Sequence, residues 1–238
     1  GHDVHIFANT CDPLDGRRYF HKIPTFSKIF LLREWIISLM ATLILKKHKF
    51  DVTLAQPTRY FSPDVCEMQY VYKEWDNFVT ENKMEIPLSS WIGSKITSRI
   101  ESVNIRKAKA IIAISERVKR EVLKNYPDIE EDKIHVIYSG VNLKEFEPKL
   151  RNSYMKKIRK KHNIPLNTNL LLFVGNPFGR KGLEYVIKAL AKLKDKNSML
   201  LVSGNDKPDK YIELAKKLGV EDRVRWNIGL TTKIYEYY

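Results

Sequence analysis

The chain has 238 residues, a length that suits one large domain or two smaller ones with ordinary hydrophobic cores. Hydrophobic residues make up 43% of it and charged residues 29%, which excludes a wholly disordered chain and a low-complexity or collagen-like one. The net charge of +14 is uneven: residues 1–146 hold 22 basic against 19 acidic side chains, and residues 147–238 hold 20 against 9. The second part therefore offers a positive surface for nucleic acid, an anionic membrane or a phosphorylated ligand.

Short apolar runs alternate with longer amphipathic segments, which is the pattern of parallel strands joined by crossover helices. The expected strands cover residues 4–8, 51–55, 110–114, 134–138, 170–174, 199–203 and 223–227. The expected helices cover residues 26–47, 91–107, 115–125, 150–162, 183–193 and 209–218. Ser115 is expected to cap the helix that begins there. The sequence thus predicts an α/β fold.

Residues 138–148 follow neither the strand nor the helix period, and they predict a connection between two units. We place the boundary near residue 147, which gives domains over 1–147 and 148–238. Both ends look interrupted, because a strand and helix are expected before Gly1 and more of the second sheet is expected after Tyr238. We therefore expect an internal piece of a longer protein.

The most apolar stretch, residues 35–45, is far shorter than the roughly 20 residues that span a bilayer. A buried helix and a helix that touches a membrane surface both stay open as interpretations. No signal peptide is visible. Cys11 and Cys66 lack partners at metal-ligand spacing, and no histidine pairs with a cysteine or carboxylate at such spacing. We therefore expect no metal site, no disulfide framework and a reducing, cytoplasmic setting.

The most informative stretch is residues 170–190, where a buried strand ends in a loop that opens a helix. The glycines of this loop are Gly175, Gly179 and Gly182. Glycines let a backbone approach a ligand closely, and free N–H groups at the start of a helix suit an anion. Arg180 and Lys181 stand at the positive end of that helix, where they are unfavourable unless an anion binds. The alternative is a pair of solvated loop residues.

The spacing of this loop matches neither a Walker motif nor the dinucleotide-binding Gly-x-Gly-x-x-Gly, which disfavours ATPase and dehydrogenase functions. The strand over 199–203 ends in a second loop at the same edge of the sheet, the edge where ligands of parallel sheets bind. Lys207 and Lys210 in this second loop are expected either to join Arg180 and Lys181 around a diphosphate or to be ordinary surface lysines.

Several motifs together resemble a known family. The loop Val174-Gly-Asn-Pro-Phe-Gly-Arg-Lys-Gly182, the loop Gly204-Asn-Asp-Lys-Pro208 and residues 216–224 resemble the C-terminal domain of family-four retaining glycosyltransferases, which have the GT-B fold. Residues 113–119 and 136–146 resemble the end of the family's first domain. With Tyr60-Phe-Ser-Pro-Asp-Val-Cys66 included, the motifs are most similar to bacterial lipopolysaccharide core glucosyltransferases that act on heptose.

The resemblance implies two Rossmann-like, doubly wound parallel-sheet domains that face a cleft, both incomplete here. The first would be the acceptor side and the second the nucleotide-sugar-binding side. The implied reaction is retaining transfer of a hexose, namely glucose from UDP-glucose, to a saccharide or lipid-linked acceptor in cell-envelope polysaccharide or lipopolysaccharide synthesis. It would take place in the cytoplasm, at the inner face of the cytoplasmic membrane, without a metal cofactor.

In that reaction, glycines and cations of the two loops are expected to hold the leaving diphosphate. They are Gly179, Arg180, Lys181, Gly182, Lys207 and Lys210. Asp64 matches an acidic position of the subfamily that faces the cleft, where it is expected to orient the acceptor or the sugar. The alternative is a solvent-exposed or helix-capping aspartate. The family's Glu-x7-Glu motif and first Gly-rich loop have no match here, so the chain alone is expected to bind nucleotide weakly and to turn over little or nothing.

Two other functions stay open. An epimerase of the same fold would bind the same nucleotide sugar without transferring it. A nucleic-acid-binding module would need aromatic and polar side chains among its cations, whereas the basic helix after residue 148 has only Tyr154, so no nucleic-acid partner is expected. That helix is either a solvated face or a surface that docks on anionic lipid.

Overall fold

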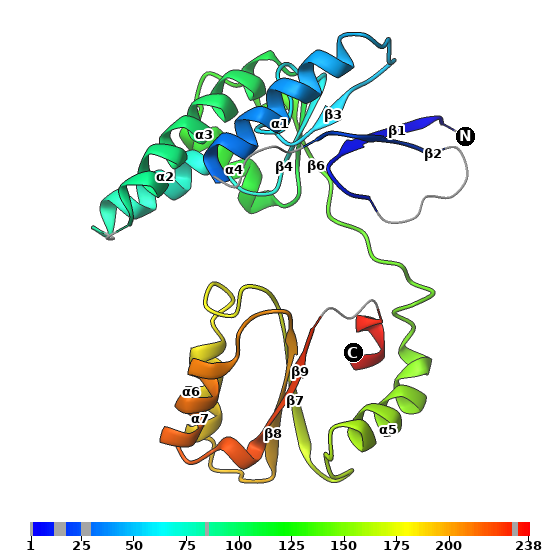
Figure 1. Ribbon diagram of the computed structural model, residues 1–238, viewed down its shortest axis with the longest axis vertical. Coiled ribbons are helices and arrows are strands. Elements are labelled where there is room, and N and C mark those ends of the chain that lie inside the picture. The colour runs from blue at the N-terminus through cyan, green and yellow to red at the C-terminus, as the bar shows by residue number, and fades with distance from the viewer. Residues whose placement is uncertain (1, 12–17, 25–29, 84–85, 230–232) are drawn as a thin grey trace. The chain divides into compact units, whose positions relative to one another are not determined.

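The chain forms two compact units, residues Gly1–Ser139 and Gly140–Tyr238 (Figure 1). The computed structural model describes residues 2–11, 18–24, 30–83, 86–229 and 233–238, with the backbone alone for residues 30–35. The structure groups residues 140–147 with the second unit, whereas the sequence placed the boundary near 147. The reason is Phe146, whose ring packs edge-on against Tyr235 and Tyr238 at centroid distances of 6.3 and 5.7 Å.

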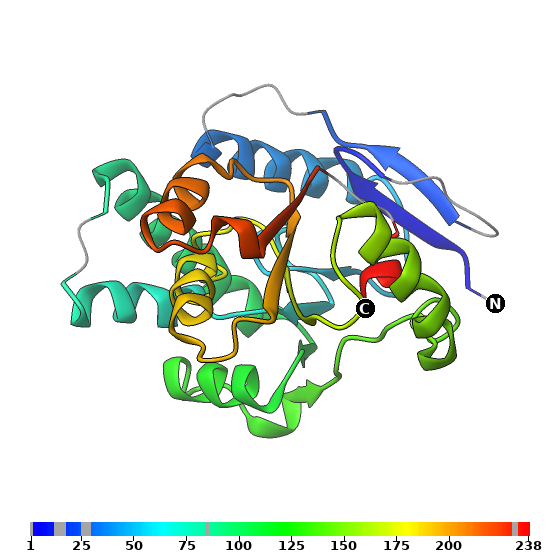
Figure 2. The ribbon, with the colours of Figure 1, turned by 90° about the horizontal axis from the view of Figure 1, so that it is seen from below.

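The first unit contains two parallel sheets within its described residues. β1 (Val4–Ala8) pairs with β2 (Arg18–Lys22), and the two run side by side in Figures 1 and 2. A second sheet has the order β3-β4-β5-β6. Its elements are β3 (Leu54–Ala55), β4 (Val65–Met68), β5 (Ala110–Ala113) and β6 (Ile134–Val136). The helices are α1 (Phe30–Leu45), α2 (Tyr72–Glu81), α3 (Leu88–Lys107), α4 (Glu116–Asn125) and the short η1 (Glu131–Lys133).

The core of the first unit lies between the second sheet and its helices. Along β5, Ile111 and Ala113 are fully buried, and they alternate with less buried residues as a strand with one inner face requires. Val118 and Val122, four residues apart on α4, are buried in the same cluster. The predicted cap of α4 is confirmed, because the Ser115 hydroxyl accepts a hydrogen bond from the Val118 N–H at 3.3 Å.

The second unit is a three-layered arrangement around a parallel sheet of order β7-β8-β9. The strands are β7 (Asn169–Val174), β8 (Ser198–Gly204) and β9 (Val224–Ile228). The helices are α5 (Arg151–Lys161), α6 (Leu183–Lys192) and α7 (Asp209–Lys217), with short turns η2 (Pro148–Leu150), η3 (Glu221–Arg223) and η4 (Ile234–Tyr237). Helices α6 and α7 cover one face and α5 the other (Figure 1). β8 is buried along nearly its whole length, as expected of a central strand.

These units confirm the predicted α/β class, and the differences are local. β2, β4 and α2 have no counterpart among the predicted elements. The predicted strand over 51–55 forms only at Leu54–Ala55, and α1 begins at Phe30, so that residues 26–29 of the predicted helix lie outside the described residues. β4 has four residues, too few for an alternating pattern to stand out from its surroundings.

Helix α1 contains the most apolar stretch of the chain, and over residues 36–45, whose side chains the structure describes, buried residues lie next to exposed ones. Ala41 is 3% exposed, whereas Leu39 and Leu43 are 52% and 51% exposed. The Thr42 hydroxyl donates a hydrogen bond of 2.7 Å to the Ser38 carbonyl one turn earlier. Within the described part of the chain, no helix combines the length and apolar character needed to cross a membrane.

Candidate functional site

Two loops of the second unit meet at one edge of its sheet. Residues 175–182 connect β7 to α6, and residues 205–208 connect β8 to α7. Because β7 and β8 are adjacent and parallel, both loops leave from carboxyl ends of strands, the edge where ligands of such sheets bind. The Gly175 N–H extends the ladder to the Ser203 carbonyl at 3.2 Å.

The backbone at Gly204 has no room for a side chain. A Cβ on Gly204 would lie 2.4 Å from the Gly175 carbonyl oxygen and 2.6 Å from the Phe178 ring. Gly182 lies directly before α6. Its φ of +79° is a left-handed conformation that favours glycine. Gly204 is thus a position where the backbone of the two loops packs closely, and it was not expected from the sequence. A close approach of Gly175, Gly179 and Gly182 to a ligand stays a prediction.

Phe178 anchors the first loop. Its side chain is fully buried between Phe173 and Tyr211, with edge-on ring contacts at 6.0 and 5.8 Å. The next two residues, Gly179 and Arg180, are exposed, and in the described part of the chain their N–H groups donate to no protein acceptor. Two backbone donors are thus free in the loop. They do not lie at the helix start itself, where the sequence predicted them, because the N–H groups of Leu183 and Tyr185 donate to the Phe178 and Gly182 carbonyls at 3.1 and 3.0 Å.

The second loop and the first turn of α7 contribute one lysine each to a pocket that includes Gly179: Lys207 lies in the loop, whereas Lys210, expected in the same loop, belongs to α7. The pocket has a volume of about 450 Å³ and is lined by Pro177, Gly179, Asp206, Lys207, Asp209, Lys210 and Tyr211. The structure thus brings together three of the expected site residues, Gly179, Lys207 and Lys210. Arg180 and Lys181 are exposed on the same loop but do not line this pocket. The Lys181 stem lies over Gly175, where an added Cβ would be 2.8 Å from its Cγ.

Two carboxylates in this pocket were not expected from the sequence. The Asp206 carboxylate accepts hydrogen bonds from the Phe178 N–H and the Lys207 N–H, each at 2.8 Å. These bonds hold the pKa of Asp206 below its ordinary value, and the Lys210 charge adds to the effect. Since Asp206 and Asp209 balance the two lysines, the excess positive charge of this edge comes from the first loop.

Tyr211 is a further lining residue that the sequence did not reveal. Its ring is buried, and a Cβ on Gly179 would lie 3.3 Å from its hydroxyl oxygen. The Lys210 ammonium lies 4.9 Å from the ring centroid. Among the described residues, no hydrogen-bond partner of the Tyr211 hydroxyl is present, so it is available to a ligand in the pocket. Nothing about a tyrosine in the first turn of an amphipathic helix indicates that its hydroxyl lines a pocket.

Asp64 lies in the first unit, directly before β4 and so at the amino end of that strand. Its carboxylate accepts hydrogen bonds from the Thr53 N–H at 2.9 Å and the Thr53 hydroxyl at 2.7 Å, and it pairs with the Lys109 ammonium at 2.8 Å. These contacts lower the pKa of Asp64 to about 2. They connect the start of β4 to the residues directly before β3 and β5, so in this structure Asp64 has a structural role. A role in orienting the acceptor stays a prediction.

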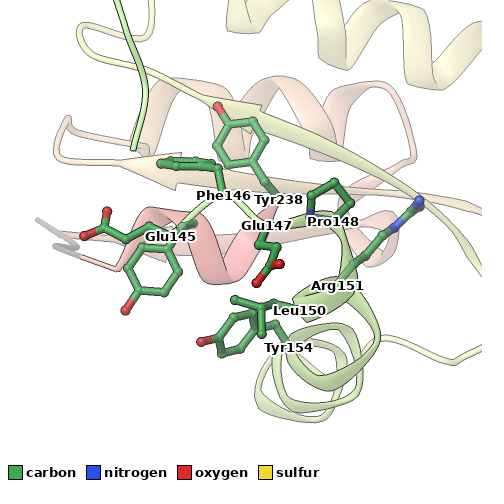
Figure 3. Close-up of a pocket in the computed structure, with 9 residues that line it drawn as sticks. Glu145, Phe146, Glu147, Pro148, Leu150, Arg151, Tyr154 and Tyr238 are labelled. Atoms are coloured by element: carbon green, nitrogen blue, oxygen red, sulfur yellow. The ribbon is translucent and has the colours of Figure 1, made fainter. Parts of the chain in front are cut away.

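A second pocket of the same unit has the opposite character. It has a volume of about 260 Å³ and lies where residues 145–148, the start of α5 and η4 meet. In Figure 3, the Glu147 carboxylate lies between the aromatic rings of Phe146, Tyr238 and Tyr154, and Arg151 points away from it. Glu145 and Glu147 outnumber Arg151, the one lysine or arginine among the described residues that line this pocket, whereas two lysines balance the two aspartates of the two-loop pocket. The two-loop edge is therefore the better candidate for an anion site.

The basic helix α5 uses several of its cations within the unit. Arg159 is buried and donates to the Thr168 carbonyl at 2.9 Å. Lys157 pairs with Glu236 at 2.8 Å, and Lys161 donates to the Tyr237 hydroxyl at 2.9 Å. The remaining cations of the helix are exposed, as both a solvated face and a lipid-docking face require, so the two interpretations stay open.

Comparison with known proteins decides the family. A model of Glycosyltransferase Family 4 matches residues 1–145, more than half of the chain, and a model of Glycosyl transferases group 1 matches residues 155–238. The chain belongs to glycosyltransferase family 4. Over 96 residues, which are 39% of the chain and 25% of the relative, it is 43% identical to lipopolysaccharide glucosyltransferase WaaG of Escherichia coli K12.

Solved structures of this family and fold agree with the architecture. The crystal structure of WaaG, a glycosyltransferase involved in lipopolysaccharide biosynthesis, matches with a TM-score of 0.79 and 25% identity, over 100% of the chain and 64% of WaaG. This match confirms the expected GT-B fold. The Anabaena Alr3699/HepE structure in complex with UDP and glucose matches with a TM-score of 0.62 over 92% of the chain and 57% of that protein, and its 15% identity shows the fold alone. The chain spans 25% to 52% of the length of curated relatives that it matches.

Proposed function

We propose that the protein to which this chain belongs transfers glucose from UDP-glucose, with retention of configuration, to a saccharide or lipid-linked acceptor of cell-envelope polysaccharide or lipopolysaccharide. The observation that carries the proposal is the two-loop edge of the second unit. There, Gly179, whose N–H group is free, lines a pocket together with Lys207 and Lys210, and the exposed residues Arg180 and Lys181 follow Gly179 in the same loop. The relative WaaG, a lipopolysaccharide glucosyltransferase, supports glucose as the sugar.

The chemistry of the proposed site follows from its charges. When the bond between the sugar and the diphosphate breaks, negative charge grows on the diphosphate. Cations and N–H groups fixed at that position before the reaction stabilise the leaving group without further reorganisation. In this proposal, Arg180, Lys181, Lys207 and Lys210 supply that charge in place of a divalent metal. We therefore expect chelation with EDTA to leave nucleotide binding unchanged.

Isothermal titration calorimetry with UDP, GDP and UMP tests the proposal. We expect UDP to bind more tightly than the other two, and we expect an Arg180→Ala, Lys181→Ala double variant to lose at least tenfold in UDP affinity. A Lys216→Ala, Lys217→Ala variant is the matched control, because it removes the same charge from the last turn of α7, away from the pocket. Equal loss in both variants would show general charge attraction and would contradict a defined diphosphate site.

Location at the inner face of the cytoplasmic membrane is a separate part of the proposal. Its support is the exposed pair Leu39 and Leu43 on α1 together with the exposed cations of α5, such as Lys156 and Lys160. Sedimentation with vesicles that contain anionic lipid measures it. We expect binding that weakens at high salt and is absent with neutral vesicles, and binding to neither kind would contradict membrane contact.

A further inference from the structure

The two loops of the candidate site are joined by side chains as well as by the sheet. The Asn176 amide oxygen on the first loop accepts a hydrogen bond from the Asn205 N–H on the second at 2.7 Å. In the other direction, the Asp206 carboxylate on the second loop accepts from the Phe178 N–H on the first at 2.8 Å. The other carboxylate oxygen of Asp206 accepts from the Lys207 N–H at 2.8 Å, which fixes the rotamer of the side chain.

Asp206 stands where a negative charge is unexpected. It lines the pocket that holds Gly179 and both candidate lysines, and its pKa is lowered, so that it is ionised at neutral pH. A free carboxylate next to a diphosphate would repel it. The hydrogen bond to Phe178 gives a reason for its presence, because Phe178 is the buried anchor directly before the two residues whose N–H groups are free.

We propose that Asp206 is a positioning residue of the diphosphate site: by holding the Phe178 peptide, it directs the N–H groups of Gly179 and Arg180 outward toward the ligand. The inference rests on the proposed function. Gly204 fits this arrangement, because only a residue without a side chain lets the second loop come close enough, with an added Cβ 2.8 Å from the Asn176 amide oxygen. The contact thus orders the site before the nucleotide arrives and lowers the entropic cost of binding.

The sign of one mutational effect separates this role from simple charge repulsion. If Asp206 only repels the diphosphate, Asp206→Ala tightens UDP binding. If it positions the loop, Asp206→Ala weakens UDP binding, by at least fivefold in our expectation, and Asp206→Asn restores most of the affinity because the amide oxygen still accepts from the Phe178 N–H. Asp209→Ala is the charge control: it removes the same charge from the same pocket but no bond to the first loop, so we expect equal or tighter binding.

The test combines UDP calorimetry with amide hydrogen exchange on the same variants. We expect the Phe178 N–H to exchange at least tenfold faster in Asp206→Ala, with the amides of β7 to β9 unchanged. Unchanged or tighter UDP binding by Asp206→Ala overturns the inference. If the unaltered chain binds no UDP, the diphosphate site proposed for this chain is absent, and Phe178 exchange alone decides whether Asp206 holds the loop. Should Asp206→Ala unfold the second unit, Asp206→Asn still separates the two roles: charge repulsion alone predicts tighter UDP binding by this variant, whereas positioning predicts equal or slightly weaker binding.

Discussion

Tyr126 donates a hydrogen bond of 2.7 Å to the Glu101 carboxylate inside the core of the first unit. Tyr126 is 1% exposed and Glu101 is fully buried. The same carboxylate also accepts from the Tyr72 N–H at 2.9 Å, where α2 begins. A buried acid thus connects the end of α4 to the start of α2. Among the described residues, no cation lies within ion-pair distance of the Glu101 carboxylate. The stability of the first unit therefore depends on whether Glu101 is protonated.

The first prediction concerns the pH dependence that Glu101 creates. Burial raises the pKa of Glu101 to about 7, from an ordinary value near 4.5, despite the hydrogen bonds that oppose the shift. Between these two values the folded state binds more protons than the unfolded state, so stability falls as the pH rises from 4.5 to 7. We expect this contribution to decrease by up to about 3 kcal/mol over that range. Glu101→Gln is expected to flatten the profile.

Urea denaturation at several pH values measures this effect, with tryptophan fluorescence as the signal. A Trp226→Phe background restricts the signal to the first unit, because the other three tryptophans lie there. Glu74→Gln is a suitable control, since Glu74 is a partly exposed acid of α2 whose pKa is lowered. A Glu101→Gln profile as steep as that of the unaltered chain would contradict the prediction.

The second prediction concerns the histidines next to β1 and β2. His5 and His21 share a hydrogen bond of 2.8 Å, and His21 stacks on Phe7 at 4.4 Å. Burial lowers the pKa of His21, as do the charges of His5 and His48. The unfolded state therefore binds more protons below the ordinary pKa of 6.5, and stability is lost as the pH falls through that value. Glu101 acts in the opposite direction over the same range.

We expect His21→Phe to keep the ring stacking and to remove this loss at low pH. The measurement is hydrogen exchange of the β1 and β2 amides at pH values from 5 to 7.5, corrected for intrinsic exchange rates. His135→Phe is the control, because His135 is an exposed residue of β6, outside this aromatic group. If protection of these amides is independent of pH in the unaltered chain, the histidines do not act together in this way.

Long periodic segments made most of the fold predictable. The central strand β8 is a continuous apolar run and the helices α6 and α7 are amphipathic, so sequence and structure agree to within a residue. β2 is exposed at four of its five residues, so its sequence shows no apolar face, and β4 has only four residues. Helix α2 buries Asp76, a residue type that argues against an inner face.

The sequence predicted those features of the candidate site that follow from residue type. It did not predict the features that depend on contacts between the two loops. Glycines and cations in a loop after a strand indicated the first loop. Nothing in the sequence shows that Asp206 accepts from the Phe178 N–H, or that Lys181 lies over Gly175, because both contacts depend on how two loops meet. For Asp64, the predicted position at the cleft relied on a family resemblance. Its observed partners, Thr53 and Lys109, lie within its own unit.

The third prediction separates the two possible roles of Asp64. Asp64→Asn weakens the bonds to Thr53 and removes the pair with Lys109, whose side chain is 81% exposed and contributes little through charge alone. We expect a loss of about 1–2 kcal/mol, mostly from the hydrogen bonds. This stabilisation is present above the ordinary pKa of 3.8 and is lost as the pH falls toward 2. Lys109→Ala is expected to cost less. Unchanged stability of Asp64→Asn in urea would favour the acceptor-orienting role.

The fourth prediction concerns the Tyr211 hydroxyl. Its ring packs against Phe178 and its oxygen borders the pocket beside Gly179, with no hydrogen-bond partner in the described part of the protein. A Tyr211→Phe variant keeps the ring packing, so we expect the thermal midpoint of the second unit to stay within about 2 °C. If the hydroxyl donates to the diphosphate, UDP affinity falls by roughly three- to tenfold, in line with about 1 kcal/mol for one hydrogen bond. Tyr185→Phe, an exposed tyrosine of α6, provides the control for removal of a hydroxyl. Full UDP affinity in Tyr211→Phe would exclude the hydroxyl from the site and leave Gly179, Lys207 and Lys210 as the groups on that side of the pocket.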